Sequence, residues 1–215
     1  LQKKILEYSS AVKEMKISAD VVKGFEKEGL VSIERERCYR TPLPKTILFQ
    51  KPAVLNNEQQ KAVKEILEEW NSDSPRPCLI KGVTGSGKTE VYMELISHVL
   101  ERGKQVILLI PEIALTYQNV SRFYARFGDQ VSLIHSRMSQ GERYDQFERA
   151  KEGKISVMIG PRSALFTPFQ KLGLILIDEE HEDSYKSEKT PCYHARETAI
   201  QRGKMEGAYV VMGSA

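Results

Sequence analysis

The most informative stretch of the chain reads Gly82-Val83-Thr84-Gly85-Ser86-Gly87-Lys88-Thr89. It fits the P-loop pattern G-x-x-x-x-G-K-[ST] at every fixed position. An apolar run, Cys78-Leu79-Ile80, precedes it, and apolar residues at helical spacing follow it from Val91 to Leu100. A P-loop needs this order of strand, loop and helix, because backbone N–H groups and the helix N-terminus together bind phosphate oxygens. The stretch therefore predicts a binding site for a nucleoside triphosphate. The plain alternative is a glycine-rich turn that binds nothing.

Three side chains have separate expected roles at this site. Lys88 is expected to reach the β- and γ-phosphates of ATP, and the Thr89 hydroxyl to ligate Mg²⁺. Upstream, Asn56 is a candidate cap for a helical pattern that contains Gln59. A glutamine just inside such a helix can pair with the edge of adenine, so Gln59 is the candidate base-recognition residue. A solvent-facing glutamine remains the alternative.

A second signal is the apolar run 174–177 that ends in Asp178, Glu179, Glu180 and His181. Ligands of open α/β sheets bind at the carboxyl ends of the strands. Asp178 is expected to hold Mg²⁺ there, and Glu179 is expected to orient and deprotonate the attacking water. The predicted catalytic residues are therefore Lys88, Asp178 and Glu179, with a strand capped by solvated acids as the alternative.

The patterning divides the chain into two parts joined by a linker. Apolar runs alternate with helical patterns after residue 54, which predicts an α/β fold with a parallel sheet covered on both faces. Residues 1–41 contain a helix with a start at Ser18 and a stop at Gly29, followed by two short strands within 30–40. This order suggests a winged helix, which either contacts DNA or serves as a spacer. The closely spaced prolines Pro42 and Pro44 predict an extended linker over 42–53.

Composition adds a few limits. The net charge of +3 is too small to indicate nucleic-acid binding by itself, and 40% hydrophobic with 28% charged residues is ordinary for a globular chain. No apolar run reaches membrane-spanning length. The cysteines Cys38, Cys78 and Cys192 are far apart, which predicts neither zinc nor a disulfide framework and suits a reducing cytoplasm. Because the chain starts at Leu1 and stops at Ala215 inside a motif, it is expected to be a fragment of a longer protein.

The motifs together carry a specific resemblance. Residues 178–181, Asp-Glu-Glu-His, resemble the DEAH-type box of superfamily 2 helicases. With the P-loop they form a set whose other members are Pro111 to Thr116, His135-Ser136, Gly160 to Phe166, Ser184 to Lys186, and Tyr193 to Arg196. Over residues 54–215 this set resembles primosomal protein N′ (PriA), a family of replication-restart helicases. The final Gly213-Ser214-Ala215 is similar to the start of helicase motif III. The resemblance implies a winged-helix domain at 1–41 and a first RecA-like lobe at 54–215, truncated at motif III.

The resemblance also implies an activity and partners. Members are ATP-driven 3′ to 5′ helicases that act on single-stranded and forked DNA and assemble the primosome at stalled forks. The expected cofactors are ATP and Mg²⁺, and zinc is expected only in a missing C-terminal part. The expected partners are other primosome and replisome-loading proteins and single-stranded DNA-binding protein, with no membrane, for a monomer in the bacterial cytoplasm near the nucleoid. The arginine finger belongs to the missing second lobe, so this chain alone should bind ATP but hydrolyse it poorly.

The resemblance further implies a DNA side. Thr116, Arg162 and Ser163 follow strands and are expected to hold DNA phosphates, unless these are ordinary turns with a structural arginine. An aromatic-rich loop follows the acids, with Tyr185, Lys186, Tyr193 and Arg196 as candidate DNA contacts. The alternative is a surface loop whose aromatics pack onto the lobe. His181 is the candidate coupling residue, bridging Glu179 and the motif III segment.

Two other functions stay open at this stage. A double-strand DNA translocase shares the P-loop and the acid pair but does not need an aromatic loop. A DNA-binding scaffold with a nucleotide switch does not need the intact acid pair.

Overall fold

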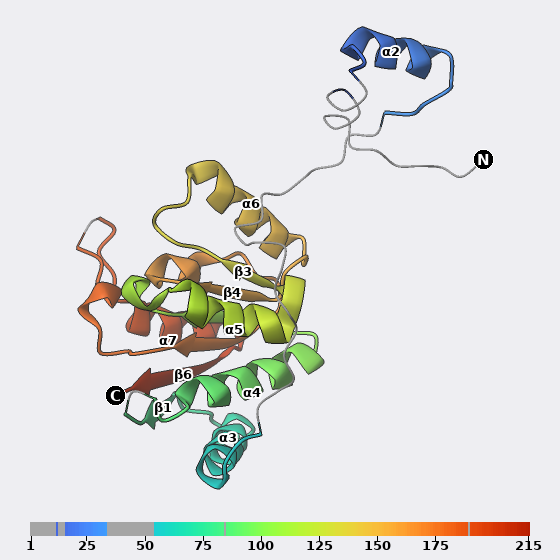
Figure 1. Cartoon of the computed structure of the whole chain (residues 1–215). Coiled ribbons are helices and arrows are strands. Elements are labelled where there is room, and N and C mark those ends of the chain that lie inside the picture. Colours follow the sequence, from blue (N-terminus) through green and yellow to red (C-terminus); the bar gives the residue numbers. More distant parts are fainter. Residues whose placement is uncertain (1–11, 13–15, 34–53, 84, 189) are drawn as a thin grey trace. The chain divides into compact units, whose positions relative to one another are not determined.

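A computed structural model of the chain describes residues 12, 16–33, 54–83, 85–188 and 190–215 (Figure 1). The chain divides into two compact units, Leu1–Cys38 and Tyr39–Ala215, and each is considered by itself. Over the described residues, no helix has the length and apolar character needed to cross a bilayer.

The first unit contains helix α2 (Ala19–Lys27), and its two ends follow from the sequence. The Ser18 hydroxyl accepts a hydrogen bond from the backbone N–H of Val21, which caps the start. At the other end Gly29 takes a φ of 72°, and the Leu30 N–H donates to the Phe25 carbonyl at 2.9 Å. This left-handed glycine stop confirms the predicted helix limits. Residues 30–33 carry no strand, and the rest of the predicted β-ribbon and the 42–53 linker lie outside the described residues.

The second unit is built on a sheet of six parallel strands in the order β1-β6-β5-β2-β4-β3. The strands are β1 (Cys78–Lys81), β2 (Gln105–Leu109), β3 (Val131–Leu133), β4 (Val157–Gly160), β5 (Leu172–Ile177) and β6 (Tyr209–Ser214). The predicted α/β class with a parallel sheet is confirmed. In this strand order β6, the last strand of the chain, lies between β1 and β5. The loops that follow β1 and β5 therefore both adjoin the end of β6.

Helices cover both faces of the sheet, as a parallel sheet of apolar strands requires. On one face lie α3 (Asn57–Trp70), α4 (Lys88–Glu101) and α5 (Tyr117–Phe127); on the other, α6 (Gln140–Lys151) and α7 (Ala195–Glu206) (Figure 1). The short 3₁₀ turns are η1 (Glu112–Ala114), η2 (Gly128–Gln130), η3 (Arg162–Phe166) and η4 (Asp183–Tyr185). Strand β5 shows the two-sided burial: Leu174 and Leu176 pack toward α4, whereas Ile175 and Ile177 pack in the cluster that contains α7.

The central strand should therefore dominate stability. Leu174→Ala, at a fully buried position of β5, is expected to lower the free energy of unfolding by about 2–5 kcal/mol. Leu79→Ala is the matched control on strand β1, where the leucine is 54% exposed, and should cost about 1 kcal/mol or less. Urea denaturation followed by circular dichroism measures both. Equal losses for the two variants would contradict the burial pattern.

Candidate nucleotide and metal site

Three strand ends meet at one edge of the sheet. The register pairs Lys81 of β1 with Ser214 of β6, and Ile177 of β5 with Met212 of β6. The loop that follows β1 and the acids that follow β5 therefore both adjoin the end of β6. Backbone hydrogen bonds hold them together: the Gly82 N–H donates to the Ser214 carbonyl at 3.0 Å, and the Glu180 N–H donates to the Gly213 carbonyl at 2.8 Å.

The predicted P-loop leads directly into α4. Gly87 is the N-cap of this helix with a φ of 89°, a left-handed conformation that favours glycine. No side chain caps α4, whereas Asn56, Thr116 and Ser139 cap α3, α5 and α6. The first turn of α4 therefore keeps backbone N–H groups for another acceptor, which is the arrangement of a phosphate site. Val83, Gly85 and Ser86 are exposed on the loop, and Thr84 lies outside the described residues.

Lys88 lies at the centre of the site. Its side chain is only 8% exposed, and its ammonium donates to the carbonyls of Gly82 at 2.6 Å and Ser214 at 3.3 Å. Glu179 Oε1 completes the environment with an ion pair at 3.2 Å. A buried ammonium requires acceptors of this kind, and phosphate oxygens belong to the same class. The residues present thus fit the phosphates of a nucleoside triphosphate.

Gln59 lies against the P-loop. A Cβ added at Gly87 would come within 2.1 Å of Gln59 Nε2, so the amide passes directly over the loop glycine. Its Oε1 accepts from the Asn56 N–H at 3.0 Å and completes a capping box at the start of α3. The location suits a base-recognition residue, while adenine recognition itself stays a prediction.

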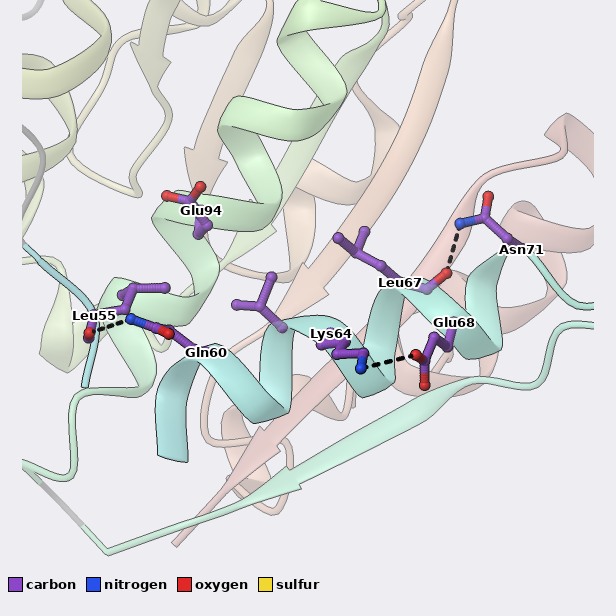
Figure 2. A pocket seen from close by; sticks show the side chains of 8 residues that line it. Leu55, Gln60, Lys64, Leu67, Glu68, Asn71 and Glu94 are labelled. Atoms are coloured by element: carbon purple, nitrogen blue, oxygen red, sulfur yellow. Dashed lines mark hydrogen bonds and ion pairs between the residues drawn. The ribbon is translucent and has the colours of Figure 1, made fainter. Parts of the chain in front are cut away.

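The neighbouring Gln60 points elsewhere. Its amide donates to the Leu55 carbonyl at 2.8 Å, on the rim of an open groove of about 640 Å³ (Figure 2). The groove lies along α3 and is closed by Glu94 of α4. Its lining residues are Leu55, Gln60, Val63, Lys64, Leu67, Glu68, Asn71 and Glu94. No P-loop or acid residue that the structure describes lines it, so this groove is separate from the phosphate site.

Asp178 is fixed by a residue that the sequence analysis did not select. The Tyr92 hydroxyl on α4 donates to Asp178 Oδ1 at 3.0 Å. Burial raises the pKa of Asp178, and the Tyr92 hydrogen bond opposes that rise. Thr89 stands in the first turn of the same helix. A hydroxyl and a carboxylate are ligands that Mg²⁺ accepts, so the pair fits a magnesium site, which stays a prediction.

Glu179 and His181 complete the acidic side. Glu179 has a φ of 46°, an uncommon conformation for a residue with a side chain, and such conformations cluster at functional sites. His181 Nδ1 lies 3.1 Å from Ser214 Oγ and 3.8 Å from Glu179 Oε2. The histidine thus lies between Glu179 and the end of β6, where the helicase resemblance led us to expect it. Its coupling role stays a prediction.

Two candidate DNA contacts are turned onto the protein. The Arg162 guanidinium donates to the carbonyls of Ser184, at 2.9 Å, and Lys186, and Arg196 donates to Glu180 Oε2 at 2.9 Å. For Arg162 these contacts favour the structural-arginine alternative, because its guanidinium already has acceptors. Arg196 likewise has a carboxylate acceptor on the protein. Ser163 is half-buried in η3.

Thr116 is occupied as well, but it remains at the surface. Its hydroxyl accepts from the Asn119 N–H at 3.3 Å and thereby caps α5. The residue is exposed at a helix N-terminus, a position from which backbone N–H groups can hold phosphate. Its assignment to DNA stays a prediction.

Tyr185 requires a correction. We expected it to stack on DNA, but it is 1% exposed, and its hydroxyl donates to the Asp178 carbonyl at 2.6 Å. Its ring is part of the apolar cluster on the α7 face, so it offers no face to a base in this structure.

Other parts of the aromatic-rich loop are at the surface. Lys186 is exposed and forms an antiparallel bridge with His194. Tyr193 packs edge-on against Phe166, with 5.2 Å between ring centroids, and Phe166 is 53% exposed. Tyr193 is half-buried, and Phe166 belongs to η3, so the pair joins the loop to η3 and exposes chiefly the Phe166 ring. Sequence reasoning had quoted Phe166 only as part of a motif.

The remaining loops at this edge are also tied together. Glu112 Oε1 accepts from the Ser136 N–H at 2.8 Å, and this hydrogen bond lowers the Glu112 pKa. Arg143 donates to the Ser136 carbonyl at 2.8 Å. The two motif segments that follow β2 and β3 thus form one connected surface.

Comparison with known proteins identifies the family. A family model described as "Type III restriction enzyme, res subunit" matches residues 53–202. The chain belongs to this family. Within it the expected likeness to replication-restart helicases is confirmed, because the chain is 46% identical over 200 residues to replication restart protein PriA of Bacillus subtilis. The PriA of Chlamydia pneumoniae is 42% identical over 214 residues.

The coverage of these relatives is unequal. The Bacillus match spans 92% of this chain but 25% of that protein, and the Chlamydia match spans 96% and 28%. The chain thus spans about a quarter of the length of these relatives. Among solved structures, the UvsW helicase of bacteriophage T4 matches with a TM-score of 0.53 at 16% identity, covering 99% of this chain and 75% of that one. This likeness supports the RecA-like α/β fold.

The buried carboxyl of Asp178 should make stability depend on pH. Its folded pKa is raised by burial, so ionisation at neutral pH destabilises the native state. Asp178→Asn removes that charge and retains an acceptor for Tyr92. The variant should therefore be more stable than the parent above the raised pKa, and the difference should shrink as pH falls through it. Urea denaturation midpoints of both proteins between pH 4 and 8 measure this difference. The range starts near the ordinary aspartate pKa of about 3.9, where the two proteins should differ least. A lower stability of the variant that does not change with pH would contradict burial as the dominant cause.

Proposed function

We propose that this chain forms the first motor lobe of an ATP-dependent 3′ to 5′ DNA helicase that restarts replication at stalled forks. The observation that carries the proposal is the pairing of Lys88 with Glu179 across the end of β6. It brings a P-loop lysine and a candidate base into one site, next to Asp178. The similarity to PriA proteins supports replication restart as the setting.

Each residue has a role in the proposed hydrolysis. The backbone of residues 82–89 and Lys88 bind the phosphates, and Gln59 would pair with the edge of the adenine. Thr89 and Asp178 would hold Mg²⁺, which when bound neutralises charge on the phosphates. Glu179 accepts the proton of the attacking water and orients it. With the arginine finger in a second lobe, this chain alone would bind ATP and hydrolyse it slowly.

The proposed DNA surface is the set of loops that follow the strands. Its exposed members are Thr116, Lys186 and Phe166, and its half-buried members are Ser163 and Tyr193, the latter packed against Phe166. Arg162 and Arg196 would support this surface from behind through their contacts with Ser184 and Glu180. Aromatic faces and backbone amides bind single strands without reading sequence.

The whole protein would have further parts and partners. We propose single-stranded and forked DNA, primosome and replisome-loading proteins and single-stranded DNA-binding protein as partners of a cytoplasmic bacterial monomer. A winged helix over residues 1–41, a linker over 42–53 and a zinc-binding part elsewhere in the protein complete the proposal. The decisive measurement is ATP hydrolysis by the intact protein with and without fork DNA, paired with strand displacement. Stimulation by fork DNA without displacement would favour a double-strand translocase, and no hydrolysis at all would favour a nucleotide-switched scaffold.

Lys88 provides the direct test of the phosphate site. Lys88→Ala should weaken ADP binding about ten- to hundredfold, because charge-assisted hydrogen bonds contribute about 1.5–3 kcal/mol. Lys61→Ala, whose side chain is 76% exposed on α3, is the control and should bind as the parent does. Fluorescent ADP titration measures both. Equal affinity of the two variants would remove the phosphate site from the proposal.

The aromatic pair tests the DNA surface. Phe166→Ala and Tyr193→Ala should each weaken binding to a single-stranded oligonucleotide about fivefold or more, since stacking contributes about 1–3 kcal/mol per base. Nucleotide affinity should not change. Tyr144→Ala, an exposed tyrosine on α6, is the control. Fluorescence anisotropy of a labelled oligonucleotide gives the affinities, and a loss shared equally by all three variants would argue against this surface.

A further inference from the structure

A buried tyrosine of the P-loop helix touches the acidic strand end. Tyr92 lies one helical turn after Lys88 and is 1% exposed. Its hydroxyl donates to Asp178 Oδ1 at 3.0 Å. A phenol buried this deeply needs a hydrogen-bond partner, and here the partner is a carboxylate on a different element, 86 residues along the chain.

Strand β6 is shaped around this hydrogen bond. A Cβ added at Gly213 would come within 1.7 Å of the Tyr92 hydroxyl oxygen and 3.0 Å of its Cζ. The same Cβ would be 3.5 Å from Asp178 Oδ1. The hydroxyl therefore occupies the space that a side chain at 213 would take, between β6 and the carboxylate. Only glycine at this position permits the contact.

The consequence is an interlock of three elements. Tyr92 belongs to α4, Gly213 to β6, and Asp178 follows β5. The hydrogen bond engages one of the two carboxylate oxygens, so it restricts rotation about the Cβ–Cγ bond of Asp178. Because Tyr92 shares a helix with Lys88 and Thr89, the carboxylate is fixed relative to the P-loop itself.

We propose that Tyr92 is a positioning residue that orients the Asp178 carboxylate toward the Mg²⁺ of a bound nucleotide. This rests on the proposed function, in which Asp178 and Thr89 hold that ion. Outer-shell groups of this kind set the direction of a metal ligand, and their loss costs about 10- to 100-fold in metal affinity. The plain alternative is a core tyrosine that donates to the nearest acceptor without effect on the metal.

The chain provides a matched pair of variants. Tyr92→Phe removes only the hydroxyl that contacts Asp178. Tyr124→Phe makes the same change in α5, where the buried hydroxyl has no hydrogen-bond partner in the part of the chain that the structure describes. Any effect of losing a buried tyrosine hydroxyl in general would occur in both. An effect through Asp178 would occur only in Tyr92→Phe.

The experiment titrates fluorescent ADP onto the 215-residue chain, with and without Mg²⁺. In Tyr92→Phe, the Mg²⁺ concentration that half-maximally tightens ADP binding should rise about tenfold. The affinity measured in EDTA should stay within about twofold of the parent, since phosphate contacts are intact. Tyr124→Phe should match the parent in both conditions. The inference would be overturned if Tyr92→Phe and Tyr124→Phe required the same Mg²⁺ concentration. It would also be overturned if Tyr92→Phe lost as much ADP affinity in EDTA as it loses in Mg²⁺.

Gly213→Ala gives an independent route to the same hydroxyl. It should raise the Mg²⁺ requirement in the parent and add little in a Tyr92→Phe background, because both changes act on one contact. Additive effects would contradict the interlock. Gly213→Ala alone also tests the contact if Tyr92→Phe does not fold.

The two possible failures can be told apart. If the parent binds no ADP with or without Mg²⁺, the proposed function fails together with the inference. If the parent binds ADP and Tyr92→Phe shows the same response to Mg²⁺ as the parent, only the inference fails.

Discussion

The ammonium group of Lys88 is the point on which the site depends. A buried cation is stable only among acceptors, and here the acceptors are the carbonyls of Gly82 and Ser214 and the carboxylate of Glu179. They follow or end three different strands: β1, β6 and β5. The lysine can be satisfied in this way only if β6 lies between the other two. The strand order of the sheet is therefore a condition of the site's electrostatics as well as of its packing.

The same edge of the sheet joins the nucleotide side to the aromatic-rich loop. Tyr185 donates to the backbone carbonyl of Asp178, and Arg196 is paired with the adjacent Glu180. Arg162 from the loop after β4 holds the carbonyls on either side of Tyr185. The loop is thus attached to the acids at two points and to a neighbouring loop at a third. The acids and the loop are therefore joined by direct contacts between protein atoms.

Local sequence patterns predicted those features of the molecule that depend only on residues close together in the sequence. The P-loop, the acid pair, the capped helices and the apolar strands each leave a signal within about ten residues of sequence. The position of β6 leaves no such signal, because strand order is set by packing between segments far apart in the chain. The resemblance of residues 213–215 to a helicase motif gave Ser214 no role, and the contact of its carbonyl with Lys88 followed only from the sheet.

The tyrosines show the same limit at the level of single residues. An aromatic residue among charged ones suggests stacking, and Tyr193 is only half-buried and packs against the exposed Phe166. Tyr185 has the same sequence context but is buried. Its ring packs in the apolar cluster, and its hydroxyl donates to the Asp178 carbonyl. Tyr92 reads as an ordinary core position on an amphipathic helix. Its spacing of one turn from Lys88 was the available clue, since a core tyrosine must have a partner for its hydroxyl.

The ion pair between Lys88 and Glu179 also bears on which acid acts in the proposed hydrolysis. The Lys88 side chain is 8% exposed, and its ammonium lies 3.2 Å from Glu179 Oε1. A carboxylate at this distance from a P-loop lysine adjoins the phosphates that the lysine is proposed to bind, since charge-assisted hydrogen bonds to phosphate oxygens are similarly short. The next residue, Glu180, is instead paired with Arg196 at 2.9 Å. The contacts of the two consecutive glutamates therefore distinguish Glu179 as the candidate base.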